Sequence, residues 1–296
     1  MSIALVAVVI AMVIGHVAPV TVAALRRFDW FAHGLHWLGE NAASAFWRGR
    51  CGIALALMPV LLPLAAMQWW LDEPWLGLPG LVFDIFVLLW AWGPRDLDVD
   101  VEAVIDSHDA ASRNAAIARL WPNAGDAQSD GPALVGAVFD SALARWFGVL
   151  FWFLLLGPFG AMLYRLLERA SNGDAASALP EANLAGVRGV RAVLGWPVAQ
   201  LMTLSMALVG NFDVVRRAWR EAGGKSFKPG NGFLAAAARA SVRSELAEEA
   251  DEYAVEGMTQ ALRDLPELRD AMSLVWRILL LWLAVLAVFV IGGWVS

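Results

Sequence analysis

Arginines and carboxylates alternate in three short stretches of the sequence. The stretches consist of Arg95, Asp96 and Asp98; of Asp140 and Arg145; and of Asp213, Arg216 and Arg217. A guanidinium presents its donors in a planar fork that matches the oxygens of a phosphate or a carboxylate. Two interpretations stay open: the stretches bind an anionic ligand, or their charges pair with one another at a membrane surface, which is the commoner use of such residues.

Three further polar residues lie next to or within apolar runs. Tyr164 and Arg165 end an uncharged run that begins at Trp146, and we include both among the ligand-binding candidates. Asp84 lies inside a second apolar run. A carboxylate at membrane depth is costly unless it faces the protein interior or a wet cavity. We therefore expect Asp84 to face neighbouring helices, as a hydrogen-bonding group or, less commonly, as a transport or catalytic carboxylate.

The spacing of the remaining polar residues gives no support to metal or phosphate-loop chemistry. His33 and His36 stand three residues apart, but two ligands do not make a site and no acidic residue follows them in a zincin arrangement. Gly224 and Lys225 are preceded by Trp219 where a phosphate loop needs its first glycine. The single Cys51 excludes an intramolecular disulfide. We predict no metal site and no cofactor.

The composition is that of an integral membrane protein. Hydrophobic residues make up 59% of the chain and charged residues 17%, whereas about a quarter of the residues of a soluble domain are charged. The net charge of −6 offers no basic surface for nucleic acid. Membrane lipid is therefore the expected partner, and nucleic acid is not.

The apolar runs divide the chain into five parts. Membrane helices are predicted at 3–25, 52–71 and 75–92 in an N-terminal group (1–92), in a central group (146–212), and in a C-terminal helix (278–296). The intervening segments 93–145 and 213–277 are polar, and we predict amphipathic helices within them at 98–120 and 232–258. These two segments are expected to be cytoplasmic and helical.

The central group is interrupted at 157–160, where the sequence reads Gly-Pro-Phe-Gly. Backbone groups that such a break frees inside hydrocarbon must find partners, because no water is available there. The break therefore predicts that this run lies inside a bundle, against helices that can supply those partners.

The distribution of arginines favours one topology and leaves a second open. If the arginine-rich links at 26–50, 95–145 and 213–277 are cytoplasmic, six spans result and both termini are outside. The link 165–191 then lies outside although it holds four arginines. If the central run and 192–212 form a re-entrant pair, this link stays inside and four crossings remain. The predicted fold is thus an all-α polytopic membrane protein with four to six spanning helices and amphipathic cytoplasmic helices.

Three stretches of the chain resemble the AmpE family of inner-membrane proteins, which is associated with induction of AmpC β-lactamase. They are Trp-Gly-Pro-Arg-Asp-Leu at 92–97, the run at 151–166 around the Gly-Pro-Phe-Gly break, and Leu-Gly-Trp-Pro-Val-Ala at 194–199 with Ala-Leu-Val-Gly-Asn-Phe at 207–212. The resemblance implies a multi-pass protein of the bacterial inner membrane. It also implies a regulatory role in the response to β-lactams and cell-wall damage, with cytoplasmic or inner-membrane signalling partners.

AmpE is in turn similar to the CobD/CbiB family, membrane synthases of cobalamin biosynthesis that join an aminopropanol or its phosphate to cobyric acid. That family carries Glu-Asn and a following Asp before its central span, and Pro-Ala-Arg after its second pair of helices. Here the corresponding stretches read Asp-Ser-Ala-Leu-Ala-Arg at 140–145 and Pro-Val-Ala-Gln at 197–200, without the Glu-Asn pair and without the arginine. The sequence therefore predicts a regulatory membrane protein with no assigned catalytic residues, and a CobD-like amide-forming synthase is the alternative.

The arginine asymmetry predicts that the loops at 123–131 and 223–232 are cytoplasmic and that Asp72 and Glu73 are periplasmic. In a Cys51→Ser background, a cysteine introduced by Ala127→Cys should resist an impermeant thiol reagent in intact spheroplasts and react after lysis. A cysteine introduced by Asp72→Cys should react without lysis. Labelling at position 127 in intact spheroplasts would contradict the assignment.

Overall fold

The computed structural model describes residues 2–17, 26, 28–42, 44–71, 77–92, 97–121, 124–226, 230, 232–255 and 265–292. Within these residues the chain forms helices and turns and contains no strand. The chain divides into two compact units, each of which is described by itself.

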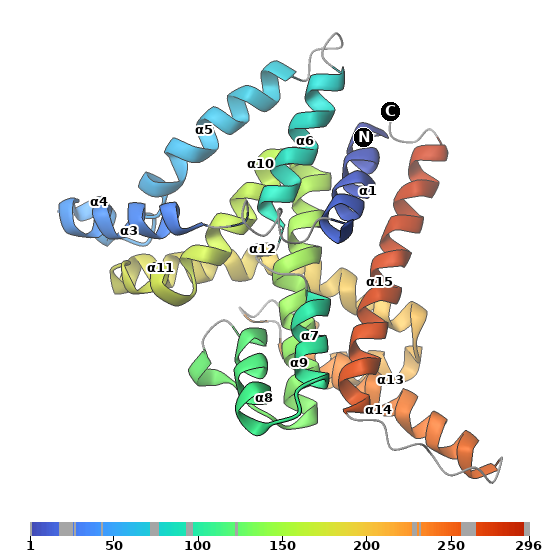
Figure 1. Ribbon diagram of the computed structural model, residues 1–296. Coiled ribbons are helices and arrows are strands. Elements are labelled where there is room, and N and C mark those ends of the chain that lie inside the picture. The colour runs from blue at the N-terminus through green and yellow to red at the C-terminus, as the bar shows by residue number, and fades with distance from the viewer. Residues whose placement is uncertain are drawn as a thin grey trace. The chain divides into compact units, whose positions relative to one another are not determined.

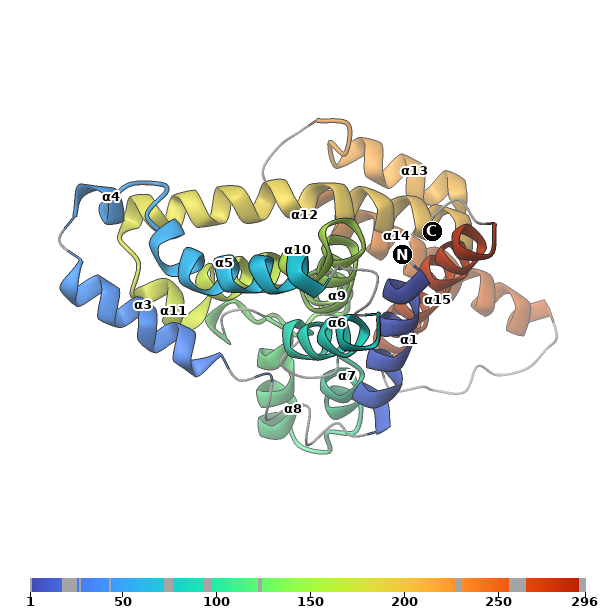
Figure 2. The same ribbon diagram turned by 90° about the horizontal axis from the view of Figure 1, so that it is seen from above.

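Unit 1 comprises Met1–Pro94, Ala144–Gly195 and Leu286–Ser296. Its helices are α1 (Ser2–Val17), α3 (Asp29–Asn41), α4 (Ala45–Arg48), α5 (Ala54–Leu71), α6 (Gly77–Ala91), α10 (Gly148–Ala170), α11 (Gly173–Ser177) and the first half of α12 (Glu181–Val209). Helix α10 packs against α5 and α6, and α1 packs against α6. Figures 1 and 2 show α5 running alongside α10, and α1 alongside α6.

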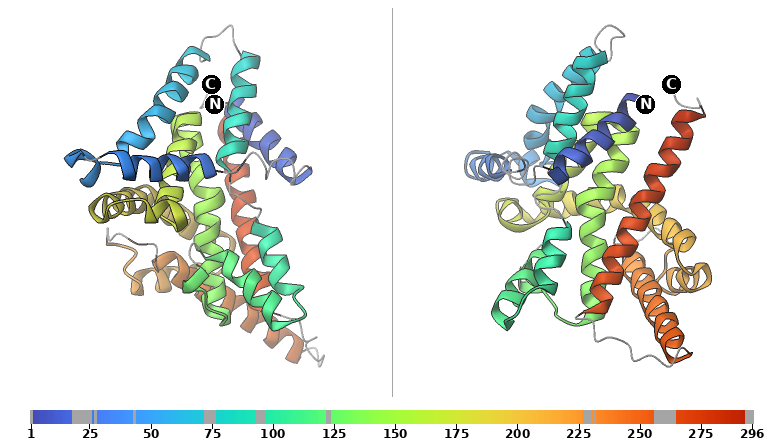
Figure 3. Two further views of the ribbon diagram at one scale, coloured as in Figure 1. Left: turned by 60° about the vertical axis from the view of Figure 1, so that its left-hand side comes forward. Right: turned by 45° about the vertical axis from the view of Figure 1, so that its right-hand side comes forward.

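Unit 2 comprises Arg95–Leu143 and Trp196–Val285. Its helices are α7 (Leu97–Ile105), α8 (Ala110–Ile117), the short 3-10 turns η2 (Ala118–Leu120) and η3 (Ala124–Asp126), α9 (Gly131–Ala142), the second half of α12, α13 (Phe212–Glu221), α14 (Gly232–Val255) and most of α15 (Pro266–Ile291). Helix α14 packs against both α9 and α13, and the α13–α14 pair is the orange part of Figure 3. A short π-helix, η4 (Leu143–Phe147), links α9 to α10.

Four helical stretches are long and apolar enough to cross a membrane. They are Ala54–Leu71, Gly131–Ala170, Glu181–Val209 and Pro266–Ile291, and shorter apolar helices cover Ala4–Gly15 and Gly77–Ala91. The predicted all-α membrane fold is therefore confirmed, with four helices that meet the length requirement. The predicted run 3–25 extends beyond α1 into residues outside the described part of the chain.

The exposed faces of these helices are apolar, as lipid contact requires. On α5, Met58 and Leu62 are exposed while Leu57, Leu61 and Leu64 are buried. At the end of α15, Ile291 is 85% exposed. Apolar surface of this extent is rare on a soluble monomer, because water would have to cover it. The pattern indicates that one face of each helix packs in the protein and the other meets hydrocarbon.

The predicted amphipathic helix at 98–120 is wrong, because the structure divides it into α7 and α8. The Asp109 carboxylate accepts a hydrogen bond from the Ser112 backbone N–H at 2.8 Å and so caps the start of α8. This hydrogen bond is the main reason why the pKa of Asp109 lies below its usual value. An aspartate that caps the next helix favours a break before it, which helical periodicity alone does not reveal.

Helix α15 begins at Pro266, well before the C-terminal apolar run predicted from 278. The first turns of α15 bury apolar residues such as Leu268 and Met272, and polar residues farther along the helix bond other helices of unit 2. Arg277 bonds Glu245 of α14 at 2.6 Å, and the Trp276 indole donates to Asp98 of α7 at 3.0 Å. Farther along, the Trp282 indole donates to Ser205 of α12 at 2.9 Å. The buried apolar residues of the first turns, at helical spacing, explain why α15 begins before the uncharged run.

The predicted break at 157–160 is confirmed within α10. Gly157 has φ 68° and ψ −157°, a backbone conformation that is essentially restricted to glycine. Gln68 of α5 bridges the break: its amide nitrogen donates to the Leu156 carbonyl at 3.2 Å, and its amide oxygen accepts from the Phe159 N–H at 3.0 Å. A neighbouring helix thus supplies the partners that hydrocarbon cannot.

We expect Gln68→Leu to lower the free energy of unfolding by about 1–3 kcal/mol, because it leaves two backbone groups unbonded in an apolar setting. Gly157→Ala should also destabilise the protein, since a β-carbon there would lie 2.5 Å from the Gln68 side-chain nitrogen. Unfolding in a mild detergent measures both effects. Met67→Leu, on an exposed neighbour, is the matched control. Equal unfolding midpoints for Gln68→Leu and Met67→Leu would contradict the bridging role.

Candidate functional site

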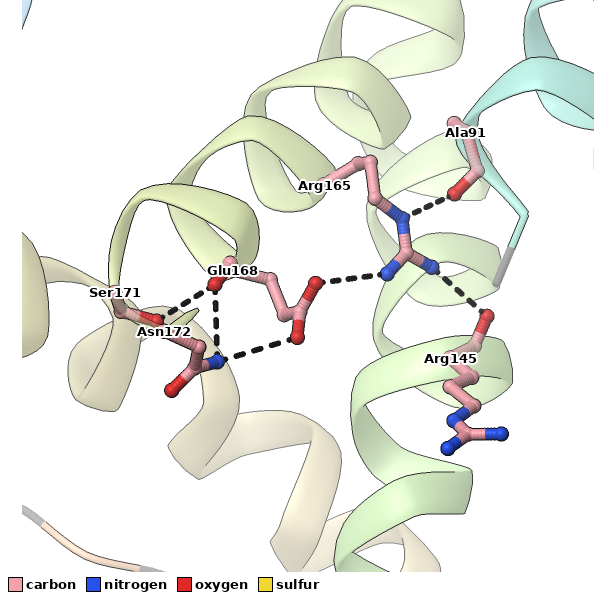
Figure 4. A network of polar contacts seen from close by, with 6 residues as sticks. All are labelled: Ala91, Arg145, Arg165, Glu168, Ser171 and Asn172. Atoms are coloured by element: carbon pink, nitrogen blue, oxygen red, sulfur yellow. Dashed lines mark hydrogen bonds and ion pairs between the residues drawn. The ribbon is translucent and has the colours of Figure 1, made fainter. Parts of the chain in front are cut away.

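The structure brings Arg145, Tyr164 and Arg165 together in unit 1. Arg165 is fully buried and is the centre of the network in Figure 4. Its Nε donates to the Ala91 carbonyl at 2.5 Å, its Nη2 donates to the Arg145 carbonyl at 3.2 Å, and its Nη1 pairs with Glu168 at 3.0 Å. All three guanidinium nitrogens therefore bond groups of the protein itself.

The partners of Arg165 are backbone carbonyls that their own helices leave available. Ala91 is the last residue of α6, and the final carbonyls of a helix have no partner within it. Arg145 lies in the π-helix η4, a local departure from the α-helical hydrogen-bond pattern. Arg165 therefore holds the end of α6 and the π-helix against α10, and its role is to position these elements.

Glu168, which the sequence reasoning missed, balances the charge of Arg165. Its Oε1 accepts from the Asn172 side chain at 3.3 Å, and its backbone carbonyl accepts from Asn172 at 3.0 Å and from Ser171 at 2.8 Å (Figure 4). The signal was present in the sequence, because a carboxylate three residues after an arginine lies on the same helical face. The sequence analysis thus included Arg165 among the site residues but did not include its ion-pair partner Glu168.

Tyr164 is buried against the first turn of α10. A β-carbon added to Gly148 would lie 2.2 Å from the Tyr164 ring. In a straight helix, residues so far apart in sequence would be roughly 24 Å apart along the axis. The break at Gly157 therefore folds the second half of α10 back on the first, and the ring packs against the bare backbone of Gly148.

Two more arginines lie close to Glu168. Arg169, in the last turn of α10, and Arg191, on α12, both interact electrostatically with its carboxylate. The guanidinium carbon of Arg169 also lies 5.6 Å from the centroid of the Phe28 ring. Of the three arginines, only Arg165 pairs directly with Glu168, and the other two add positive charge in its neighbourhood.

The other predicted site residues lie in unit 2 or outside the described residues. Asp213, Arg216 and Arg217 are exposed on α13, and Asp140 is exposed near the end of α9. Asp98 is half-buried and accepts the Trp276 hydrogen bond described above. The first stretch also included Arg95 and Asp96, which fall outside the described part of the chain. Among the predicted site residues of unit 2 that the structure describes, only those on α13 combine arginine forks with exposure.

Gln200 fixes the position of α13 relative to the second half of α12. Its side-chain oxygen accepts from the Trp219 indole at 2.9 Å, and its side-chain nitrogen donates to the Gly224 carbonyl at 2.7 Å. Gly224 packs so tightly against Trp219 that a β-carbon there would lie 2.0 Å from the indole nitrogen. Gln200 belongs to the stretch 197–200 in which this chain lacks the arginine of the CobD/CbiB pattern.

Asp84 lies on α6, half-buried, one turn before the buried Val87 and Leu88. That it faces neighbouring helices stays a prediction. In the described part of the chain, no three His, Cys, Asp or Glu side chains come together in a group that could hold a metal ion.

We expect Arg165→Met to destabilise unit 1 by about 3–5 kcal/mol, because it leaves the Glu168 charge and two carbonyls without their donor. The double variant Arg165→Met with Glu168→Gln should recover part of this loss, since the uncompensated charge is then removed. Unfolding in detergent measures both. Arg188→Met, at an exposed arginine of α12, is the control and should leave the midpoint unchanged. A midpoint for Arg165→Met close to that of this control would overturn the positioning role.

Comparison with known proteins points to one relative. No protein-family model matches the sequence, and no solved structure matches it. The chain is 28% identical over 288 residues to the cobalamin biosynthesis protein CobD of Stutzerimonas stutzeri (strain A1501), and the alignment covers 91% of each chain. This supports the relation to CobD expected from the sequence and gives no support to the relation to AmpE. The protein is therefore similar to CobD over nearly its whole length.

Proposed function

We propose that this protein is a CobD-like membrane protein of cobalamin biosynthesis, acting as the amide-forming synthase that the sequence resemblance implies. The observation that carries the proposal is the similarity to CobD across 91% of both chains. An alignment of that extent includes polar segments as well as apolar helices. Shared hydrophobicity of a few membrane helices therefore does not account for it.

The proposed substrate contacts are the exposed charges of α13. Amide formation joins a carboxylate to an amine, and one carboxylate oxygen leaves as water or, after activation by a phosphoryl donor, on phosphate. A guanidinium fork binds a carboxylate or a phosphate through two parallel hydrogen bonds. Arg216 and Arg217 are exposed on a helix that Gln200 and Trp219 hold in place. We propose that these arginines bind an anionic group of the substrate, with Asp213 nearby to bind a cationic group such as the amine.

Of the other residues predicted to contact a ligand, some stay candidates for substrate binding and others support the structure of the site. Arg95, Asp96 and Asp140 stay candidates for substrate binding. Arg145 contributes its backbone carbonyl to the Arg165 network, and Arg165 and Tyr164 are buried. A side chain that is buried and bonded or packed within the protein is not available to a substrate. We therefore assign Arg165 and Tyr164 a structural role in support of the site.

The proposal includes the bacterial inner membrane as location, with the polar segments 93–145 and 213–277 on the cytoplasmic side. The placement rests on the arginine asymmetry of the sequence and on the resemblance to membrane synthases. The regulatory role in β-lactamase induction, expected first from the AmpE resemblance, has no support from the compared proteins. The complementation experiment below distinguishes this regulatory role from the proposed synthase activity.

Expression of this protein in a bacterium that lacks CobD should restore growth under conditions that require cobalamin synthesis. The wild type should grow without added cobalamin, and the empty vector should grow only with it. Failure to restore growth, with the protein present in the membrane, would contradict the synthase proposal. A change in β-lactamase induction in the same cells would then favour the regulatory alternative.

Arg216→Ala and Arg216→Lys should both lose complementation at normal membrane abundance. Arg216 is exposed, and even an exposed ion pair would contribute at most about 1 kcal/mol, so its loss leaves the fold intact. A lysine cannot restore a forked contact. Arg243→Ala, at an exposed arginine of α14, is the matched control and should complement fully. Full complementation by Arg216→Ala would remove α13 from the proposed site.

A further inference from the structure

Two polar links that a six-span topology places on opposite sides of the membrane contact each other in unit 1. The first link is 26–50 and the second link is 165–191. His36 of the first link, on α3, pairs with Asp174 of the second, on α11, with 3.3 Å between Nε2 and Oδ2. Figures 1 and 2 show α11 beside α3. Both side chains are partly open to solvent, so the contact lies outside the hydrocarbon.

The start of α5 is held against the second link as well. The buried Asn183 side chain accepts from the Ile53 N–H at 2.9 Å and donates to the Trp47 carbonyl at 3.0 Å. Gly186 lies so close to the Arg50 carbonyl that a β-carbon there would overlap it. Groups in contact cannot lie on opposite sides of a hydrocarbon layer about 30 Å thick. The two links are therefore on the same side of the membrane.

Both ends of the uncharged central run also lie at one level. Arg165, which follows the run at 146–164, donates to the carbonyl of Arg145, which precedes it, at 3.2 Å (Figure 4). The same guanidinium donates to the carbonyl of Ala91, at the end of α6, at 2.5 Å. A run that crossed the membrane would have its ends about 30 Å apart. The central run therefore returns to the side on which it enters, which is also the side on which α6 ends.

The break at Gly157 is the turn of this hairpin. At about 1.5 Å per residue, the limb from Arg145 to Gly157 is roughly 18 Å long and the limb from Gly157 to Arg165 roughly 12 Å. Neither limb reaches across hydrocarbon about 30 Å thick. The turn therefore lies within the hydrocarbon, where the backbone groups freed by the break need the bonds that Gln68 supplies.

We propose that α10 is a re-entrant hairpin that enters and leaves the membrane from the cytoplasmic side, and that the second link is cytoplasmic like the first. The charge pattern supports this placement, because the second link holds four arginines and arginines are enriched on the cytoplasmic side. The run at 192–212 then joins two cytoplasmic segments and does not cross. The crossings that remain are 3–25, 52–71, 75–92 and 278–296. The inference concerns topology and does not depend on the proposed synthase activity.

The test is cysteine labelling of the full-length protein in a Cys51→Ser background. Ala182 is exposed in the first turn of α12, within the second link. A cysteine introduced by Ala182→Cys should resist an impermeant thiol reagent in intact spheroplasts and react after lysis. Ala127→Cys is the control for a cytoplasmic position and Asp72→Cys the control for a periplasmic one, since both topologies place them so.

The wild-type protein supplies a further comparison, because its exposed Cys51 directly follows the first link. Cys51 and Ala182→Cys should react under the same condition, after lysis. Reaction of Ala182→Cys in intact spheroplasts, as for Asp72→Cys, would overturn the proposal and favour six crossings. If Ala182→Cys does not accumulate in the membrane, Ser177→Cys, at an exposed position on α11, decides in the same way. Labelling reports topology without any activity, so failure of the synthase proposal would leave this result unchanged.

Discussion

A guanidinium buried among apolar helices must have its charge balanced and its donors bonded, and Arg165 meets both conditions. It pairs with Glu168 and donates to the carbonyls of Ala91 and Arg145, so one side chain joins the end of α6, the π-helix η4 and the second half of α10. Removing a partner from such a group is costly, whereas replacing the whole set with apolar residues is often tolerated. The network therefore constrains the geometry of unit 1 more than it adds to stability.

The break in α10 depends on the same requirement. Gly157 allows the turn, but the free carbonyl and N–H on either side of it are acceptable in an apolar setting only because Gln68 bonds both. Once the helix is folded back, Tyr164 reaches Gly148 and Arg165 reaches the carbonyl of Arg145. The bend and the buried network are thus two parts of one arrangement, in which α5 supports the first and Glu168 the second.

This division of roles bears on function. In unit 1 the charges of Arg165 and Glu168 are engaged with each other, and Glu168 also accepts from Asn172. The charges of α13 are exposed, and α13 is held to α12 through Gln200 and Trp219. In the synthase that we propose from the similarity to CobD, exposed arginines on a firmly held helix are the more suitable substrate contacts. Buried arginines serve the scaffold on which such contacts depend.

The sequence by itself determined the features that are local. Apolar runs and low charge predicted an all-α membrane protein, and Gly157 with Pro158 predicted the break, because glycine and proline act on their own stretch of backbone. Only the tertiary structure decided which residues bond the backbone groups that these local features leave free. That Gln68 bridges the break and that Arg165 bonds the carbonyl of Ala91 follows from helix packing between residues far apart in the chain. The start of α15 at Pro266 has the same cause, since Leu268 and Met272 in its first turns are buried by packing. A hydropathy profile averages over neighbouring residues in the sequence, so it cannot reveal contacts that depend on which helices pack together.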